Sequence, residues 1–227
     1  MSTIQERLDH IRRQIPEGVT LVVVSKYHSV EEIQQAYDAG VRDFGENRVQ
    51  ELVSKVDQLP KDIRWHLIGS LQRNKVKYIA PFVTSIQSVD SLALYQEVER
   101  RATQQNREID CLIEVFVAQE ETKSGLPYDE VEAFFAMLRE MQAQGGSLIR
   151  LRGIMGMATH TDCRETVRAE FAKLRTLFQR LKEGVMHDVE YFDTLSMGMS
   201  EDWSLAVEEG STMIRVGTAI MGPRSYT

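Results

Sequence analysis

A lysine follows directly on a short apolar run near the N-terminus, in the stretch TLVVVSKYHSVEE from Thr20 to Glu32. The run Leu21–Ser25 has the composition of a buried strand, and Lys26 stands where that strand ends. Desolvation and a neighbouring cation would favour the neutral amine of such a lysine, which forms imines with aldehydes. The alternative is a surface lysine that reaches solvent. The residues around Lys26 must decide between the two.

Two Gly- and hydroxyl-rich loops near the C-terminus have the composition of an anion site. The first is Ser196-Met197-Gly198-Met199-Ser200, and the second is Gly217-Thr218. Glycines let the backbone approach an anion, and a helix N-terminus adds free N–H groups. Each loop alone also fits a simpler interpretation, in which Gly198 makes a turn and Ser200 caps the next helix. Two such loops converging on one corner favour a phosphate site.

The elements that must position these residues alternate between short apolar runs and longer stretches with helical spacing. Eight strands are predicted: Leu21–Ser25, Val41–Gly45, Arg64–Gly69, Phe82–Gln87, Ile109–Val117, Ile149–Gly156, Glu190–Met197 and Met213–Gly217. The predicted helices are Thr3–Gln14, Val30–Ala39, Glu46–Gln58, Gln72–Ile79, Ser91–Gln105, Tyr128–Gln144, Arg164–Glu183 and Glu201–Glu209. Ser29 and Glu32 have the spacing of a capping box, and Gly40 and Gly210 follow helices as left-handed caps do.

Strands that alternate with helices predict parallel βαβ units, and eight of them close a (β/α)8 TIM-type barrel. We therefore predict one α/β barrel domain over residues 1–227. Too little chain follows the last strand for a full eighth helix, so the first helix is expected to cover that side. A doubly wound open sheet is the alternative architecture.

Closure of a barrel makes the last strand, which carries Arg215, the neighbour of the first. Lys26 and Arg215 are therefore expected side by side. The loops after the last two strands are the usual phosphate site of such barrels. A ligand for this corner needs both an aldehyde and a phosphate, and pyridoxal phosphate (PLP) has both.

The composition narrows the class of protein. A formal charge of -7 disfavours nucleic acid or an anionic membrane as the main partner. The N-terminus lacks the apolar core of a signal peptide, and no apolar run approaches the length of a membrane span. Cys111 and Cys163 form no close motif and are expected as buried small hydrophobes in a reducing compartment. These features predict a cytoplasmic protein.

Several long motifs resemble those of the YggS/PROSC family of pyridoxal phosphate homeostasis proteins, whose fold is the barrel of the alanine racemase N-terminal domain. The resemblance extends from Leu21 to Gly222. It is carried by VVSK (Val23–Lys26), FGENRVQE (Phe44–Glu51), WHLIGSLQRNK (Trp65–Lys75), SVDS (Ser88–Ser91), KSG (Lys123–Gly125), LSMGMSEDW (Leu195–Trp203) and GSTMIRVGTAIMG (Gly210–Gly222).

The resemblance implies a role for seven residues. Lys26 would bond PLP as an imine, Arg215 would face the pyridine nitrogen, and Asn47 would lie beside the ring or its hydroxyl. Four residues would hold the phosphate: Met199, Ser200, Gly217 and Thr218.

Some positions depart from the family pattern. Gln87 and Ser70 stand where histidines are common, and the stretch Val115–Gly125 lacks an asparagine often found there. These departures fall on the side of the third to fifth strands. His66 and Lys75 lie in a family motif but are assigned no contact, and His66 is expected to be a core histidine bonded to a neighbour.

The residues favour a protein that stores and delivers PLP over an enzyme. Arginine keeps its proton, so Arg215 can only donate a hydrogen bond to the ring nitrogen, and the ring is then a weak electron sink. Racemases with this barrel also use a tyrosine from a second domain, which we do not expect in a chain that ends at Thr227. An amino-acid racemase is the first alternative, and a phosphosugar aldolase is the second.

The expected partners are PLP and PLP-dependent apoenzymes, and the chain is expected to be a monomer. The stretch His160-Thr161-Asp162-Cys163 matches no standard metal-ligand spacing and is predicted to be a loop, so no metal site is expected.

Overall fold

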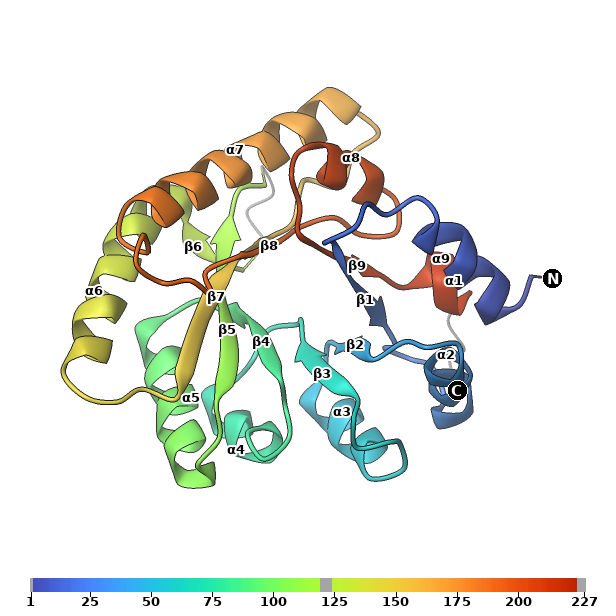
Figure 1. Cartoon of the computed structure of the whole chain (residues 1–227), viewed down its shortest axis with the longest axis horizontal. Coiled ribbons are helices and arrows are strands. Elements are labelled where there is room, and N and C mark those ends of the chain that lie inside the picture. The colour runs from blue at the N-terminus through green and yellow to red at the C-terminus, as the bar shows by residue number, and fades with distance from the viewer. Residues whose placement is uncertain (1, 119–123, 224–227) are drawn as a thin grey trace.

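The strands form a closed parallel barrel in the computed structural model, which describes residues 2–118 and 124–223. Strand pairing runs β1-β2-β3-β4-β5-β7-β8-β9, and β9 pairs with β1 to close the ring (Figure 1). The strands are β1 (Thr20–Val24), β2 (Asp43–Glu46), β3 (Arg64–Leu67), β4 (Ser85–Val89), β5 (Ile109–Phe116), β7 (Ile149–Gly156), β8 (Thr194–Ser196) and β9 (Met213–Val216). Closure confirms the barrel prediction and excludes the open sheet.

Helices cover the outside of this barrel (Figure 1). They are α1 (Ile4–Arg12), α2 (Val30–Asp38), α3 (Val49–Val56), α4 (Val76–Ile79), α5 (Leu92–Gln105), α6 (Val131–Ala143), α7 (Arg164–Glu183), α8 (Trp203–Glu208) and α9 (Thr218–Met221). Two 3-10 turns, η1 (Arg73–Lys75) and η2 (Tyr128–Glu130), precede α4 and α6. No helix in the described ranges is both long and apolar enough to cross a membrane.

Local sequence signals begin and end several of these helices as predicted. Ser29 accepts a hydrogen bond from the backbone of Glu32, whose side chain accepts one from the backbone of Ser29, so α2 begins with a complete capping box. Gly40 and Gly210 have φ of +86° and +91°, the left-handed conformation that residues with a Cβ atom disfavour. These caps fix where the chain turns back toward the next strand.

The apolar core lies between the strands and the surrounding helices. Helix α7 shows the pattern, because one face of it buries Val167, Phe171, Leu174, Leu177 and Leu181. Each such side chain stabilises the fold by about 1.5–3 kcal/mol when fully buried. This packing fixes the helices on the barrel. The loops at the strand ends therefore also have defined positions.

Helix α1 covers the side of the barrel that has no full eighth helix, as predicted. Figure 1 shows α1 beside the one-turn helix α9, and Arg7 Nε donates a hydrogen bond of 2.6 Å to the carbonyl of Ile220. The turn α9 itself, and a two-residue strand β6 (Leu126–Pro127) that pairs with β5, were not predicted.

Glu46 and Cys163 lie in other environments than the sequence predicted. Glu46 ends β2 and is completely buried, rather than opening the following helix, which begins at Val49. Cys163 is exposed at the start of α7, whereas Cys111 is buried as expected. Burial raises the pKa of the Cys111 thiol far above its usual range and leaves that residue unreactive.

Candidate functional site

A cavity of about 590 Å³ opens at the carboxyl ends of the strands. All seven residues singled out in the sequence line it: Lys26, Asn47, Met199, Ser200, Arg215, Gly217 and Thr218. They come from the connections after β1, β2, β8 and β9 and from β9 itself. The fold therefore brings together residues that are almost 200 positions apart in the sequence.

Lys26 lies two residues beyond β1 and is half-buried at the cavity wall. The pairing of β1 with β9 places Arg215 level with Val22, four residues before Lys26. The two cations therefore line one cavity from different depths, Arg215 deep in the barrel and Lys26 nearer its mouth, instead of standing side by side at one level.

Arg215 is a buried cation whose direct partners are neutral. Its guanidinium donates to the Ser196 hydroxyl at 2.5 Å and to the Gly156 carbonyl at 3.2 Å. No carboxylate of the described residues forms an ion pair with it. Burial lowers the pKa of Arg215 to about 10, against the more distant attraction of Asp202 and Glu114. Arg215 is still protonated at neutral pH, and its guanidinium can donate a hydrogen bond to an acceptor in the cavity.

The two Gly-rich loops meet through a hydrogen bond. The Gly217 N–H donates to the Ser200 hydroxyl at 3.2 Å, which joins the loop after β8 to the loop after β9. Gly198 has a φ of +97° and packs tightly on Trp203 and Ala206, so the first loop needs a glycine at this position.

Ser200 does not cap a helix, so the simpler interpretation of the first loop was wrong at this residue. Helix α8 begins at Trp203, and Asp202 occupies the position before it, where its carboxylate accepts the Met199 N–H at 2.6 Å. Ser200 and Thr218 donate no backbone hydrogen bond to any residue that the structure describes. These N–H groups lie beside the cavity and are available to an anion.

The backbone of Asn47 lies in close contact with Gly69, and this contact fixes its position. A Cβ atom at Gly69, which follows β3, would lie 2.4 Å from the Asn47 carbonyl oxygen, so only glycine fits. The Ser88 hydroxyl donates to the Gly69 carbonyl at 2.7 Å and holds that turn from the next strand. Asn47 is thereby set at the cavity wall, on the side of β2 and β3.

One wall of the cavity was not predicted from the sequence. The loop after β7 lines it from Met157 to Asp162, together with Arg164 at the start of α7. The stretch from His160 was predicted as a loop but was given no part in the site. Its position after a strand was the available signal, because residues at the carboxyl end of any barrel strand face the same opening.

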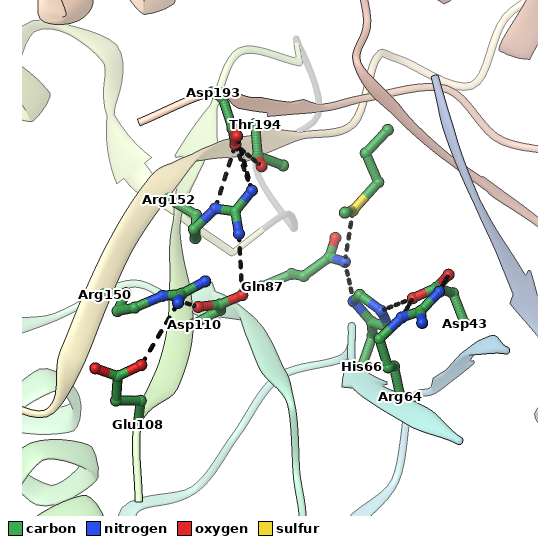
Figure 2. Close-up of polar contacts among 11 residues, drawn as sticks. Asp43, Arg64, His66, Gln87, Glu108, Asp110, Arg150, Arg152, Asp193 and Thr194 are labelled. Carbon is green, nitrogen blue, oxygen red and sulfur yellow. Dashed lines mark hydrogen bonds and ion pairs between the residues drawn. The ribbon is translucent and has the colours of Figure 1, made fainter. Parts of the chain in front are cut away.

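A row of hydrogen bonds runs from Arg215 through the interior of the barrel. The Ser196 hydroxyl donates to the Gln87 Oε1 at 2.7 Å, and the Gln87 amide contacts His66 Nδ1 at 3.2 Å. Strands β4 and β8 are not neighbours, so the bond between Gln87 and Ser196 crosses the interior. The other ring nitrogen of His66 lies 3.1 Å from Asp43, which confirms the expected core histidine (Figure 2).

Ion pairs close the opposite, amino-terminal end of the barrel. Figure 2 shows Arg64 on Asp43, and Arg152 between Asp193 and Asp110. Burial alone would raise the pKa of Asp43, but hydrogen bonds from His66 and Arg64 outweigh it and hold the pKa at about 2. These paired side chains fill the end of the barrel that lies opposite the cavity.

Two other residues of family motifs lie outside the cavity. Lys75 contacts Gln50 at 3.5 Å on the surface, and Ser70 is exposed. Lys123 of the KSG motif lies outside the described residues. Neither Lys75 nor Ser70 is part of the site.

Comparison with known proteins decides the family. A model of the alanine racemase N-terminal domain matches residues 1–225. A protein of Vibrio alginolyticus named pyridoxal phosphate homeostasis protein is 37% identical over 242 residues, which is 100% of both chains. The protein of that name from Escherichia coli K12 is 35% identical, over 93% of this chain and 88% of its own. The chain belongs to the pyridoxal phosphate homeostasis protein family.

Solved structures agree with this family assignment. PipY of Synechococcus elongatus, in a structure with PLP bound, is 38% identical over 97% of this chain and 100% of its own, with a TM-score of 0.87. A D-threonine aldolase from Filomicrobium marinum has a TM-score of 0.73 at 15% identity, over 99% of this chain and 61% of its own. The aldolase shares the barrel alone, whereas PipY shares both sequence and fold with this member of the homeostasis family.

Proposed function

We propose that this chain binds PLP through an imine on Lys26 and stores and delivers it in PLP homeostasis, without a catalysed reaction of its own. One observation carries the proposal. A single cavity is lined by Lys26 and by Arg215, a buried cation whose direct partners are neutral. PLP has an aldehyde that suits the amine and a ring nitrogen that suits the guanidinium.

The remaining residues fit the other groups of PLP. Ser200 and Thr218 have hydroxyls, and their backbone N–H groups donate to no residue in the described ranges. Gly217 and Met199 complete the two loops that would hold a phosphate. Asn47, which follows β2 next to the strand that leads into Lys26, would contact the ring hydroxyl. The PLP-bound structure of PipY supports the assignment, because that protein is 38% identical to this chain over nearly its whole length.

The state of Arg215 argues against catalysis at the α-carbon of an amino acid. A pKa of about 10 leaves it protonated at neutral pH, so it donates a hydrogen bond to the ring nitrogen and transfers no proton to it. PLP in such a site withdraws electrons weakly. The relatives are named for homeostasis and carry no enzyme name, which agrees with this view.

Absorption and mass spectrometry test the binding. The protein mixed with PLP is expected to show the visible band of a lysine imine, which borohydride abolishes while it fixes a pyridoxyl group on Lys26. Label found mainly on Lys75, or no band at all, would contradict the proposal.

A second experiment separates delivery from catalysis. The loaded protein is incubated with L-alanine in deuterated water and, separately, with an apoenzyme that needs PLP. We expect activation of the apoenzyme and at most slow, non-stereospecific exchange at the α-carbon. Rapid α-deuterium incorporation with inversion over many turnovers would instead show a racemase.

A further inference from the structure

A cluster of three charged side chains, two buried and one partly exposed, lies against the segment that carries Lys26. Glu46 ends β2, and Glu51 and Lys55 lie one turn apart on α3. The Lys55 ammonium contacts the Glu46 carboxylate at 2.8 Å and the Glu51 carboxylate at 2.7 Å. Both glutamates come from the FGENRVQE motif, and neither lines the cavity.

This cluster holds both peptide groups that flank Lys26. On one side, Lys55 donates to the Ser25 carbonyl at 3.0 Å. On the other side, the Tyr27 N–H donates to the Glu51 carboxylate at 2.5 Å. The Cα atom of Lys26 is therefore fixed between two anchored peptide planes.

A further bond strengthens the first anchor. The Ser25 hydroxyl donates to Glu46 at 2.7 Å, and both residues are completely buried. The same Glu46 oxygen accepts from Lys55, so the strand end and the helix share one acceptor. Charge-assisted bonds of this kind are stronger than those between neutral groups.

The backbone at Tyr27 needs such an anchor. Its φ is +65°, in the left-handed region that residues with a Cβ atom disfavour. A conformation of this kind persists where the surrounding structure imposes it. Here the bond to Glu51 supplies that constraint directly after Lys26.

The cluster does no covalent chemistry itself. The Lys55 ammonium donates its three hydrogen bonds to Ser25, Glu46 and Glu51, so it is not available as a nucleophile. The second oxygen of Glu46 is buried without a hydrogen-bond partner in the described part of the chain, and burial raises the pKa of Glu46. A buried carboxylate oxygen without a partner is unfavourable for folding and calls for an explanation.

We propose that Glu46, Glu51 and Lys55 are positioning residues that hold the Lys26 backbone so that its amine meets the aldehyde of the ligand. In that step the Lys26 nitrogen bonds to the aldehyde carbon and the aldehyde oxygen leaves as water. This inference rests on the proposed function, because it requires the imine on Lys26. Small displacements of a reacting group are expensive, and roughly 1 Å can cost about a hundredfold in rate.

The test compares two ligands that differ only at the reacting group. Pyridoxine 5'-phosphate has the ring and phosphate of PLP but an alcohol in place of the aldehyde, so it binds without an imine. For Glu51→Ala we expect imine formation with PLP, followed by its visible band, to slow at least tenfold. The dissociation constant for pyridoxine 5'-phosphate should stay within about twofold of the wild type.

Two variants act as controls. Glu51→Gln keeps an oxygen that can accept the Tyr27 N–H, so it should recover most of the rate. Asp57→Ala removes a carboxylate at the end of the same helix, where it forms an exposed ion pair with Lys61, and it should leave both ligands unaffected. If Glu51→Ala does not fold, Ser25→Ala replaces it, since it removes one anchor bond and no charge. Its imine formation should slow about three- to tenfold.

Several results would overturn the inference. An unchanged rate of imine formation in Glu51→Ala, or in Ser25→Ala where that variant takes its place, would show that the cluster does not position Lys26. An equal loss of affinity for both ligands would show a general structural role. If the wild type itself binds PLP without an imine on Lys26, the proposed function fails, and with it the reaction that the cluster would serve.

Discussion

Replacing Arg215 by methionine should make the ligand-free protein more stable, although two hydrogen bonds are lost. Burial in the folded protein lowers the pKa of Arg215 to about 10, well below that of a solvent-exposed arginine. At about 1.4 kcal/mol per unit, a charged Arg215 at pH 7 costs the folded state about 3 kcal/mol. The lost bonds to Ser196 and Gly156 oppose this gain by about 1 kcal/mol each, which leaves a net gain of about 1–2 kcal/mol.

The pH dependence has a definite sign. The pKa of Arg215 is lower in the folded than in the unfolded state, so the cost is fully present below about pH 10 and disappears as the pH rises above that value. Thermal unfolding at pH 7 without PLP therefore detects the full effect. For a chain of this length the Tm of Arg215→Met should rise by about 2–8 °C.

The same variant should bind PLP more weakly. A hydrogen bond from a charged group contributes about 1.5–3 kcal/mol, so affinity should fall roughly ten- to a hundredfold. The matched control is Arg152→Met, because Arg152 is paired with Asp193 at 2.7 Å and its loss leaves carboxylates without their cation. That control should lower the Tm. If Arg215→Met lowers the Tm as much, Arg215 is a structural residue and the reasoning fails.

Three further predictions concern other side chains. Lys26→Ala should eliminate the pyridoxyl label after borohydride treatment, and a label that persists would show another imine-forming lysine. Ser200→Ala and Thr218→Ala should each weaken PLP binding roughly ten- to a hundredfold in a titration, since each removes one hydrogen bond to an anion. Asp43→Asn should cost about 2 kcal/mol of unfolding free energy at pH 7, because the pKa of Asp43 is about 2 in the folded state against 3.8. That stability is present above about pH 4 and is lost as the pH falls through 2, so urea unfolding curves of wild type and variant should converge in acid.

The barrel and most of its elements could be predicted because local patterns and global packing agree. The strand Ile149–Gly156 and the helix Arg164–Glu183 have the limits predicted from their apolar spacing. The site followed from the rule that strand ends share one opening. That rule brought Lys26 and Arg215 to the same cavity without any local signal that joins them.

The misses at Glu46 and Ser200 have a common cause in contacts between different elements. A glutamate followed by polar residues is typical of a first helical turn, yet Glu46 is buried because Lys55 folds back onto it from α3. Ser200 has the residue type of a helix cap, but the hydroxyl bonds to the Gly217 backbone of another loop. In both cases the partner lies on another element of the fold, which the residues next to Glu46 or Ser200 in the sequence do not indicate.

The row of hydrogen bonds through the barrel has a single polarity. Gln87 accepts from Ser196 and turns its amide N–H toward His66 Nδ1, so the ring proton of His66 belongs on Nε2, where Asp43 accepts it. A second proton on His66 would force the Gln87 amide to rotate by half a turn and would deprive the Ser196 hydroxyl of its acceptor. A histidine at position 87 could reverse by exchanging tautomers, whereas a primary amide must physically swing round. Every hydrogen bond in this row is therefore donated in the same direction, from the Arg215 guanidinium at the cavity toward the Asp43 carboxylate at the opposite end of the barrel.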